Sequence, residues 1–208
     1  MRTLWTFGDS FTESFNTNYE WSNKYIQWKG YIPKVYGEVI SDELELELVN
    51  LGKGSSDNYS IFQAVCDSVH RINSNDIIII GWSDTIRFRL AYNQRSWQSI
   101  LSNFDTKISL LKDVSHTTIS EILVNRDNDL YKDEVHSWIK LLDYTFPNNL
   151  LIHWSWREFT PNYFRNISTI IDETTGLIND IHFGEEGHNQ LAKKLIDMIT
   201  NNQSRRLI

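Results

Sequence analysis

The chain has 208 residues, 40% hydrophobic and 23% charged, which suits one compact domain over residues 1–208 with a sizeable core. Its formal net charge of -7 argues against a nucleic acid as the main partner, because phosphate binding needs a clustered excess of Lys and Arg. Cys66 is the single cysteine, so an intrachain disulfide is excluded, and no apolar run is long enough for a membrane span. We therefore expect a cytoplasmic protein without a signal peptide that acts on a small molecule.

Short apolar runs predict the strands. The first predicted strand is TLWTF at 3–7. The second is ELELELV at 43–49, where Leu and Glu alternate with the period of a half-exposed edge strand. The third, DIIIIGW at 76–82, is a continuous β-branched run, which indicates a strand buried on both faces. A fourth strand is predicted at 149–155 and a short fifth strand around 167–171.

Amphipathic helices are predicted between and after these strands, because apolar residues recur three and four positions apart. They lie near 31–41, 58–72, 97–112, 131–145 and 185–200. The alternation of strands and helices predicts an α/β fold, in which helices cover both faces of a parallel sheet. Ligands of such open sheets bind beyond the carboxyl ends of the strands, so the residues that follow each strand are the candidates for a site.

Polar or glycine-rich segments follow the predicted strands. The first strand ends in FGDSF at 7–11, the second in NLGKGSSDN at 50–58 and the third in GWSDTIRFR at 81–89, and NDIHFGEEGH at 179–188 precedes the last helix. We expect these segments to meet at one edge of the sheet.

The segments contain the side chains that nucleophilic acyl transfer needs. A serine hydroxyl requires an imidazole to take its proton, and the imidazole requires a carboxylate to fix its tautomer. Ser10, His182 and Asp180 supply these groups. Backbone N–H groups of Ser10, Gly54 and Ser55 are the candidate donors to the oxyanion, because a glycine-rich turn lets the main chain approach a substrate closely.

In this order, the segments resemble the sequence blocks of the SGNH, or GDSL-type, hydrolases. FGDSF resembles the first block with its nucleophilic serine, NLGKGSSDN the second with its oxyanion-hole glycine, GWSD the third, and DIHFGEEGH the last with its catalytic histidine. The resemblance implies a three-layer α/β/α sandwich with a flavodoxin-like parallel sheet of about five strands. It also implies a serine esterase or acyl hydrolase without metal or cofactor, acting on a small carboxylic ester such as an O-acyl group on a carbohydrate.

Three positions differ from the family pattern or leave a choice open. Ser83 stands where the third block normally has an asparagine, so a hydroxyl replaces an amide as the expected oxyanion donor. The family carboxylate lies three residues before the histidine, where this chain has Asn179, and we assign its role to Asp180 instead. Gly54 and Ser55 compete for the place of the family glycine, and Gly54 is preferred.

Residues 85–97 and 154–165 are expected to form loops that wall the site. The candidate substrate-binding residues are Asp9 beside Ser10, Trp82 at the end of the third predicted strand, and Arg87, Trp154 and Arg157 in these loops. Arginine pairs with carboxylates or sulfates, and tryptophan stacks on sugars or holds acyl chains. The alternative is a tryptophan-rich core whose arginines pair with Asp84 or Glu158.

Other functional interpretations stay open. A catalytically weak protein of the same fold would bind a glycan or a partner surface, and an O-acyltransferase would pass the acyl group to a sugar. GWSD partly resembles the nucleophile elbow of α/β-hydrolases, with Ser83 as nucleophile, although Thr85 occupies the position of the closing glycine. His188 is interpreted as a structural residue at the start of the last helix.

Overall fold

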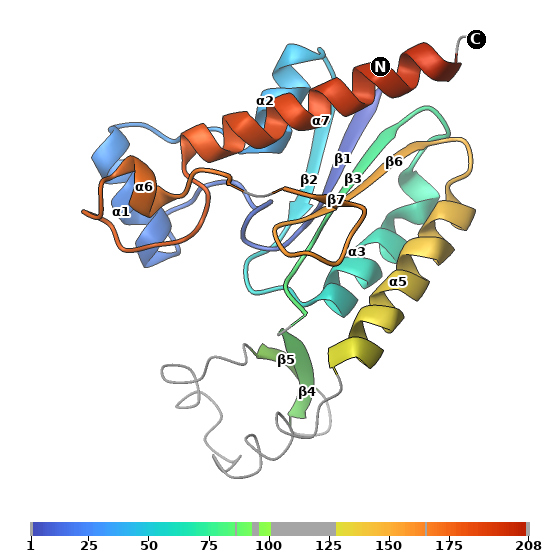
Figure 1. The fold of residues 1–208 in the computed structure, drawn as a ribbon, viewed down its shortest axis with the longest axis horizontal. Helices are drawn as coiled ribbons and strands as arrows, with labels where there is room; N and C mark the ends of the chain where they lie inside the picture. The colour runs from blue at the N-terminus through green and yellow to red at the C-terminus, as the bar shows by residue number, and fades with distance from the viewer. Residues whose placement is uncertain (1, 86, 93–95, 101–127, 165, 207–208) are drawn as a thin grey trace.

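The structure is a computed structural model that describes residues 2–85, 87–92, 96–100, 128–164 and 166–206 (Figure 1). Its elements, in chain order, are β1 (Thr3–Gly8), α1 (Glu20–Lys29), α2 (Tyr36–Glu43), β2 (Glu47–Gly52), α3 (Asn58–Ser68), the 3-10 helix η1 (Val69–Arg71), β3 (Ile77–Trp82), β4 (Phe88–Tyr92), β5 (Ser96–Ile100), α5 (Asn128–Thr145), β6 (Leu150–Ser155), β7 (Asn162–Tyr163), α6 (Ile170–Glu173) and α7 (Glu185–Arg206). No helix in the described ranges is long and apolar enough to cross a membrane.

Five strands form one sheet in the order β2-β1-β3-β6-β7, and every neighbouring pair is parallel. Counted along the sheet strands alone, this is the flavodoxin-like order. The predicted edge strand, β2, lies at the edge, and the predicted buried strand, β3, lies in the centre with all its residues buried. The α/β class and the parallel sheet are therefore confirmed.

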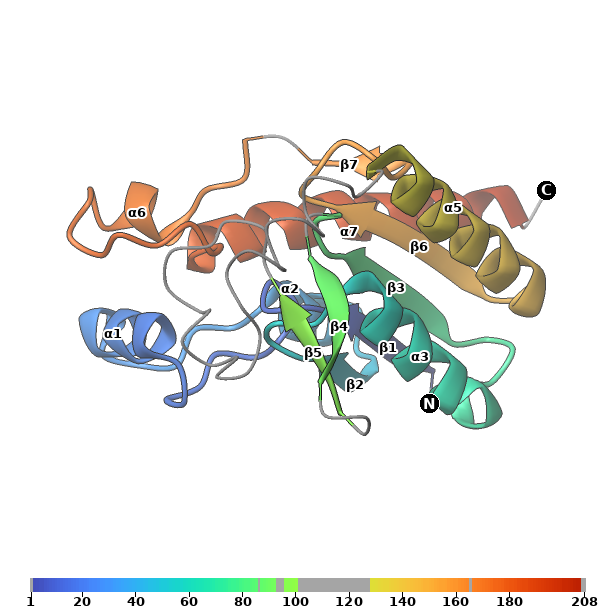
Figure 2. The same cartoon turned by 90° about the horizontal axis from the view of Figure 1, so that it is seen from below.

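Helices cover both faces of the sheet, as Figures 1 and 2 show. Successive side chains of a strand point to opposite faces. Ile77 and Ile79 accordingly join the core under α2 and α7, whereas Ile78 and Ile80 join the core under α3 and α5. Burying each such side chain contributes about 1.5–3 kcal/mol. The continuous isoleucine run thus reflects a strand that packs against helices on both sides.

The second strand begins later than its alternating sequence predicts. Helix α2 continues to Glu43, Glu45 turns the chain with a positive φ of 51°, and β2 starts only at Glu47. The glutamates of the run are nevertheless exposed and its leucines partly buried. The alternation therefore predicts which side chains face the core, although part of the run is a helix end and a turn.

Other predicted elements differ from the observed ones. The fifth strand is β7, at Asn162–Tyr163, and not 167–171. Thr169 instead starts α6 through a capping box with Asp172, whose carboxylate accepts the backbone N–H and hydroxyl of Thr169.

The regions around β4 and β5 and after β6 also need correction. The predicted helix 97–112 is wrong at its start, because β5 occupies Ser96–Ile100, and residues 101–112 lie outside the described ranges. The expected loop 85–97 includes all of β4 and the start of β5, which pair antiparallel, and the expected loop 154–165 includes the end of β6 and all of β7. Helix α1 was not predicted, and it carries Trp21, whose ring stacks on His182.

Candidate active site

Ser10 lies in a tight turn directly after β1. The backbone N–H groups of Thr12 and Glu13 donate to the carbonyl of Asp9 at 2.9 and 3.0 Å, and the Asp9 carboxylate accepts the N–H of Phe11 at 3.0 Å. A side chain at Gly8 would approach Thr12 Oγ1 to 2.1 Å, so only glycine fits before this turn. The sequence around Ser10 therefore sets the direction in which its hydroxyl points.

His182 and Asp180 lie on a segment that pairs with the start of α6. The N–H groups of Ile170 and Ile171 donate to the carbonyls of His182 and Asp180 at 2.8 and 3.0 Å. Asp180 Oδ1 lies 2.6 Å from His182 Nδ1 and also accepts the backbone N–H of His182 at 2.8 Å. A carboxylate two residues before the histidine can therefore reach the imidazole, because the side chain folds back over its own turn.

The structure brings Ser10, His182 and Asp180 together in one hydrogen-bonded line. His182 Nε2 lies 2.8 Å from Ser10 Oγ, on the opposite side of the ring from Asp180. With a hydrogen on Nδ1, which Asp180 favours, Nε2 is free to accept the serine proton. Ser10 is 8% exposed, and the side chains of His182 and Asp180 are each 19% exposed. The group is thus sheltered but reachable from solvent.

Two aromatic rings stack on His182. Trp21 of α1 lies parallel to the imidazole, with 4.0 Å between ring centroids and an interplanar angle of 1°. Phe11 stacks at 5.0 Å and 29°. Neither contact was predicted, because each joins residues far apart in the chain. The helical spacing of Trp21, Tyr25 and Trp28 is a signal that could have identified α1.

The backbone of the second segment offers a different oxyanion donor from the one preferred in the sequence analysis. The N–H of Gly54 donates to Glu13 Oε2 at 2.6 Å, so it is already used. Ser55 takes the left-handed conformation, with φ of 65°, that favours glycine. Within the described ranges, the backbone N–H groups of Ser10 and Ser55 make no hydrogen bond. Ser55 therefore replaces Gly54 as the better candidate.

Ser83 is also occupied elsewhere. Its hydroxyl donates to Asp9 Oδ2 at 2.7 Å, and its backbone N–H donates to Asn58 Oδ1 at 2.7 Å. The side chain is fully buried. The expectation that Ser83 donates to an oxyanion is therefore corrected, as is its alternative interpretation as the nucleophile of an elbow.

Asp9 and Arg87 form a buried ion pair beneath the site. Arg87 Nη1 lies 3.2 Å from Asp9 Oδ2 and 3.1 Å from the carbonyl oxygen of Ser56, to which it donates. The side chains of Asp9 and Arg87 are 3% and 9% exposed. Because their charged groups are buried and paired with each other, they are not the substrate contacts that we expected. They tie the turn of Ser10 to the loop of Ser55.

Tryptophans that were candidate substrate contacts belong to the core. Trp82 and Trp154 are each 1% exposed and pack into the two clusters on either face of the sheet. Arg157 Nε donates to Asp84 Oδ2 at 2.8 Å, and the guanidinium stacks over Trp156. The alternative of a tryptophan-rich core with an arginine paired to Asp84 is therefore the observed one.

His188, six residues after His182, is a structural residue. It is 2% exposed, and its Nδ1 accepts the backbone N–H of Tyr36 at 3.3 Å. Burial, helped by the nearby His182, lowers the pKa of His188 to about 3. The ring stays neutral at physiological pH. Among the described residues, no cluster of three or more His, Cys, Asp or Glu side chains is arranged to hold a metal ion.

Comparison with known proteins finds similar structures only. No family model matches the sequence, and no relative is found among curated proteins. An acetyl xylan esterase from the rumen bacterium Butyrivibrio proteoclasticus is 13% identical with a TM-score of 0.52, over 98% of this chain and 64% of that one. A member of the lipolytic G-D-S-L family from Veillonella parvula is 14% identical with a TM-score of 0.41, over 96% of this chain and 99% of that one.

The chain spans less than two thirds of the Butyrivibrio esterase structure. At such low identity, the likeness to that esterase shows a shared fold. The shared fold is an α/β fold with a five-stranded parallel sheet.

Proposed function

We propose that the protein is a serine esterase that hydrolyses carboxylic esters through an acyl-enzyme, with Ser10, His182 and Asp180 as its catalytic residues. The observation that carries this proposal is the continuous line of hydrogen bonds from Ser10 Oγ through both ring nitrogens of His182 to Asp180. A hydroxyl, an imidazole and a carboxylate in this geometry are the parts of an activated nucleophile.

In the first half of the reaction, Ser10 Oγ attacks the ester carbonyl while its proton moves to His182 Nε2. The carbonyl oxygen becomes an oxyanion, to which the backbone N–H groups of Ser10 and Ser55 donate. His182 then passes the proton to the leaving alcohol, and the bond between that oxygen and the acyl carbon breaks. Asp180 remains ionised and holds the hydrogen on Nδ1 throughout.

In the second half, water replaces the alcohol. His182 Nε2 takes a proton from the water, whose oxygen attacks the acyl carbon of the esterified Ser10. The second oxyanion collapses, the proton returns to Ser10 Oγ, and the carboxylic acid leaves.

An O-acetyl group on a carbohydrate is the substrate class that we propose. The fold shared with an acetyl xylan esterase supports this choice. Trp156 also supports it, because this partly buried ring lies against Phe11, the residue after Ser10, with 5.1 Å between ring centroids, and tryptophan stacks on sugars.

A second candidate is a protein of this fold that binds such a carbohydrate without hydrolysing it. The observation in its favour is Ser83, whose hydroxyl is bonded to Asp9 in the place of a family asparagine that would donate to the oxyanion. Losing one oxyanion donor typically lowers turnover about a hundredfold to a thousandfold.

Acetate release from acetylated xylo-oligosaccharides, and nitrophenol release from p-nitrophenyl acetate, separate the two functions. The esterase proposal expects both products from the parent protein and neither above background from a folded Ser10→Ala variant. Binding of the oligosaccharide without acetate release would favour the second candidate. Full activity of Ser10→Ala would contradict the proposed nucleophile.

A further inference from the structure

Trp21 lies against the imidazole of His182, and other aromatic rings hold it there. The indole is parallel to the imidazole at 4.0 Å. Phe15 meets the indole edge-on at 5.9 Å, and Tyr19 stacks on it at 6.1 Å. Trp21 is therefore held by two aromatic neighbours besides His182. It contacts the face of the imidazole, whereas Ser10 and Asp180 contact the nitrogens at its edge.

Helix α1, which carries Trp21, is fastened to the elements on either side of His182. The Tyr25 hydroxyl donates to Glu173 of α6 and accepts the backbone N–H of Glu185, the first residue of α7, at 2.8 Å. Burial, with the neighbouring Glu173, raises the pKa of Tyr25 well above its ordinary value, so the hydroxyl stays a donor. Figure 1 shows α1 beside α6 at one end of the molecule.

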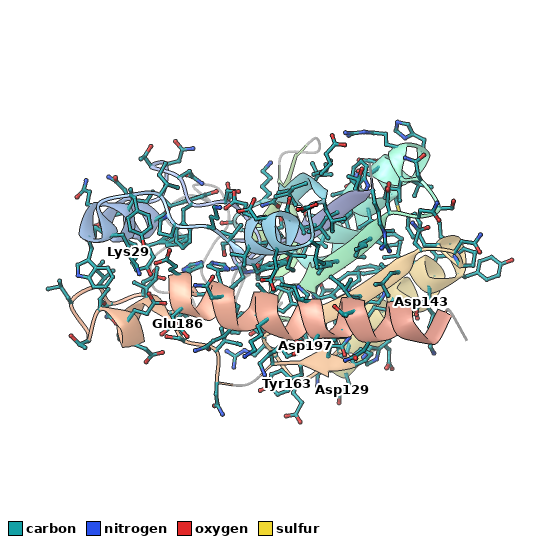
Figure 3. All side chains as sticks on the ribbon, turned by 90° about the horizontal axis from the view of Figure 1, so that it is seen from above. Lys29, Asp129, Asp143, Tyr163, Glu186 and Asp197 are labelled. Atoms are coloured by element: carbon teal, nitrogen blue, oxygen red, sulfur yellow. The ribbon has the colours of Figure 1, made fainter. Side chains whose placement is uncertain are left out.

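A charged contact adds to this attachment. Lys29 Nζ lies 2.7 Å from Glu185 and 3.7 Å from Glu173, with its side chain 19% exposed. Figure 3 labels Lys29 and Glu186, the second residue of α7, at the same end of the molecule. Helix α1 and the segment that carries His182 are thus joined at several points, and the indole is held at a fixed place relative to the imidazole.

During the proposed reaction, a contact on the face of the His182 imidazole would help to keep the ring in its plane. The side-chain torsion that turns a histidine ring about its own axis is broad, so hydrogen bonds at the ring edge normally set the ring plane. In the free protein both ring nitrogens are bonded. Once Ser10 is acylated, its oxygen has no hydrogen to donate, and Nε2 loses that partner until water arrives. A ring stacked on the imidazole face does not depend on Ser10.

We propose that Trp21 is a positioning residue that keeps the His182 imidazole in its catalytic plane while Ser10 is acylated. The inference rests on the proposed esterase function and deepens it. Trp21 acts through His182 and contacts no reacting atom. Its loss therefore slows the attack of water on the acyl-enzyme more than it slows the formation of the acyl-enzyme.

Pre-steady-state hydrolysis of p-nitrophenyl acetate tests this inference with the full chain. We expect Trp21→Leu to release a burst of nitrophenol equal to the enzyme concentration and then to turn over about ten to a hundred times more slowly than the parent. In this variant kcat and KM fall together, so that kcat/KM, which reports acylation, changes little. Trp21→Phe, which keeps a flat ring, should recover most of the parent kcat.

Trp28→Leu is the matched control, because Trp28 lies on the same helix but is 44% exposed. Its kcat should stay within about twofold of the parent value. Thermal unfolding of every variant establishes that it is folded, and Trp21→Met replaces Trp21→Leu if the latter does not fold.

If the parent is active, two results would overturn the inference about Trp21 and leave the proposed esterase function standing. One is a parent-like kcat in Trp21→Leu or Trp21→Met. The other is an equal fall in kcat and kcat/KM without a burst, which a merely structural role would produce. A parent that releases no nitrophenol overturns the proposed esterase function and this inference with it.

Discussion

The described residues contain two hydrogen-bonded aspartate–histidine pairs, and the third partner of each histidine differs. At the proposed active site, His182 lies between Asp180 and the hydroxyl of Ser10. On β6, His153 Nε2 lies 3.2 Å from Asp143 Oδ1, and His153 Nδ1 accepts the indole N–H of Trp82 at 3.1 Å. Figure 3 labels Asp143 at the opposite end of the molecule from Lys29 of α1.

The difference shows why an aspartate–histidine pair alone does not define a catalytic site. The indole N–H of Trp82 donates to the acceptor nitrogen of His153, and an indole, unlike a serine, has no hydroxyl oxygen that the imidazole could activate as a nucleophile. Burial lowers the pKa of His153, although Asp143 opposes this effect, so the ring stays neutral and structural. At the equivalent nitrogen of His182 lies the hydroxyl of Ser10, whose oxygen can attack a substrate once the imidazole has taken its proton.

Replacing the two histidines in turn gives the largest expected contrast. His182→Gln should lower kcat for p-nitrophenyl acetate by about ten-thousandfold or more, because no group remains to take the proton of Ser10. His153→Gln should leave kcat within about twofold, at a temperature where it is folded. Steady-state kinetics of both variants measures the contrast, and comparable losses in the two would contradict it.

The two aspartates offer the next contrast. Asp180→Asn should lower kcat about a thousandfold to ten-thousandfold, because an amide favours the wrong tautomer of His182. Asp143→Asn should change neither kcat nor stability by much, since the Asp143 side chain is 57% exposed. If Asp180→Asn kept parent activity while folded, another group would have to orient His182.

A third histidine, His188, should affect how the free energy of unfolding depends on pH and not the reaction. The pKa of His188 is about 3 in the folded protein and near 6.5 in an unfolded chain. Between these values the unfolded state binds the extra proton, so the stabilising contribution is complete above about pH 6.5 and is lost as the pH falls towards 3. The free energy of unfolding should fall by about 1.4 kcal/mol per pH unit from this group, in the same direction as from His153.

Urea unfolding between pH 7 and pH 4 measures this slope. His188→Asn keeps an acceptor near the backbone N–H of Tyr36 but cannot be protonated in this range. Its slope should be shallower than that of the parent by about 1.4 kcal/mol per pH unit. Equal slopes in parent and variant would show that His188 is not held neutral by burial.

The smallest expected effect is at Trp82. Trp82→Phe removes the N–H that His153 accepts and should lower the free energy of unfolding by about 1–3 kcal/mol, with kcat within about twofold. Urea unfolding together with steady-state kinetics checks both parts. A large loss of kcat with an unchanged free energy of unfolding would contradict this account and assign Trp82 to the active site.

The sequence predicts what lies close to the strand ends along the chain. The four polar segments place Ser10 and His182 at one edge of the sheet, and the continuous apolar run at 76–82 identifies the central strand. These signals are local, because a strand and the turn that follows it are adjacent in sequence. The sequence also predicted that Asp180, and not position 179, supplies the carboxylate beside His182, and Asp180 does contact the ring.

What the sequence did not predict depends on tertiary contacts. The residues next to a tryptophan in the sequence do not show whether its side chain is buried. Trp82 and Trp154 were therefore predicted to contact substrate, although both are buried. The use of the Gly54 N–H by Glu13 and the stack of Trp21 on His182 join residues far apart in the chain. Only the packing of α1 and the loop after β2 reveals them.

Covalent labelling with a fluorophosphonate tests the proposed nucleophile most directly. The reagent forms a stable bond with a serine that an adjacent base has activated. Intact-mass and peptide analysis of the folded protein should find one adduct per chain, on Ser10, with no adduct in Ser10→Ala and slow labelling in His182→Gln. The absence of an adduct on the folded parent, or an adduct on another serine, would contradict the account.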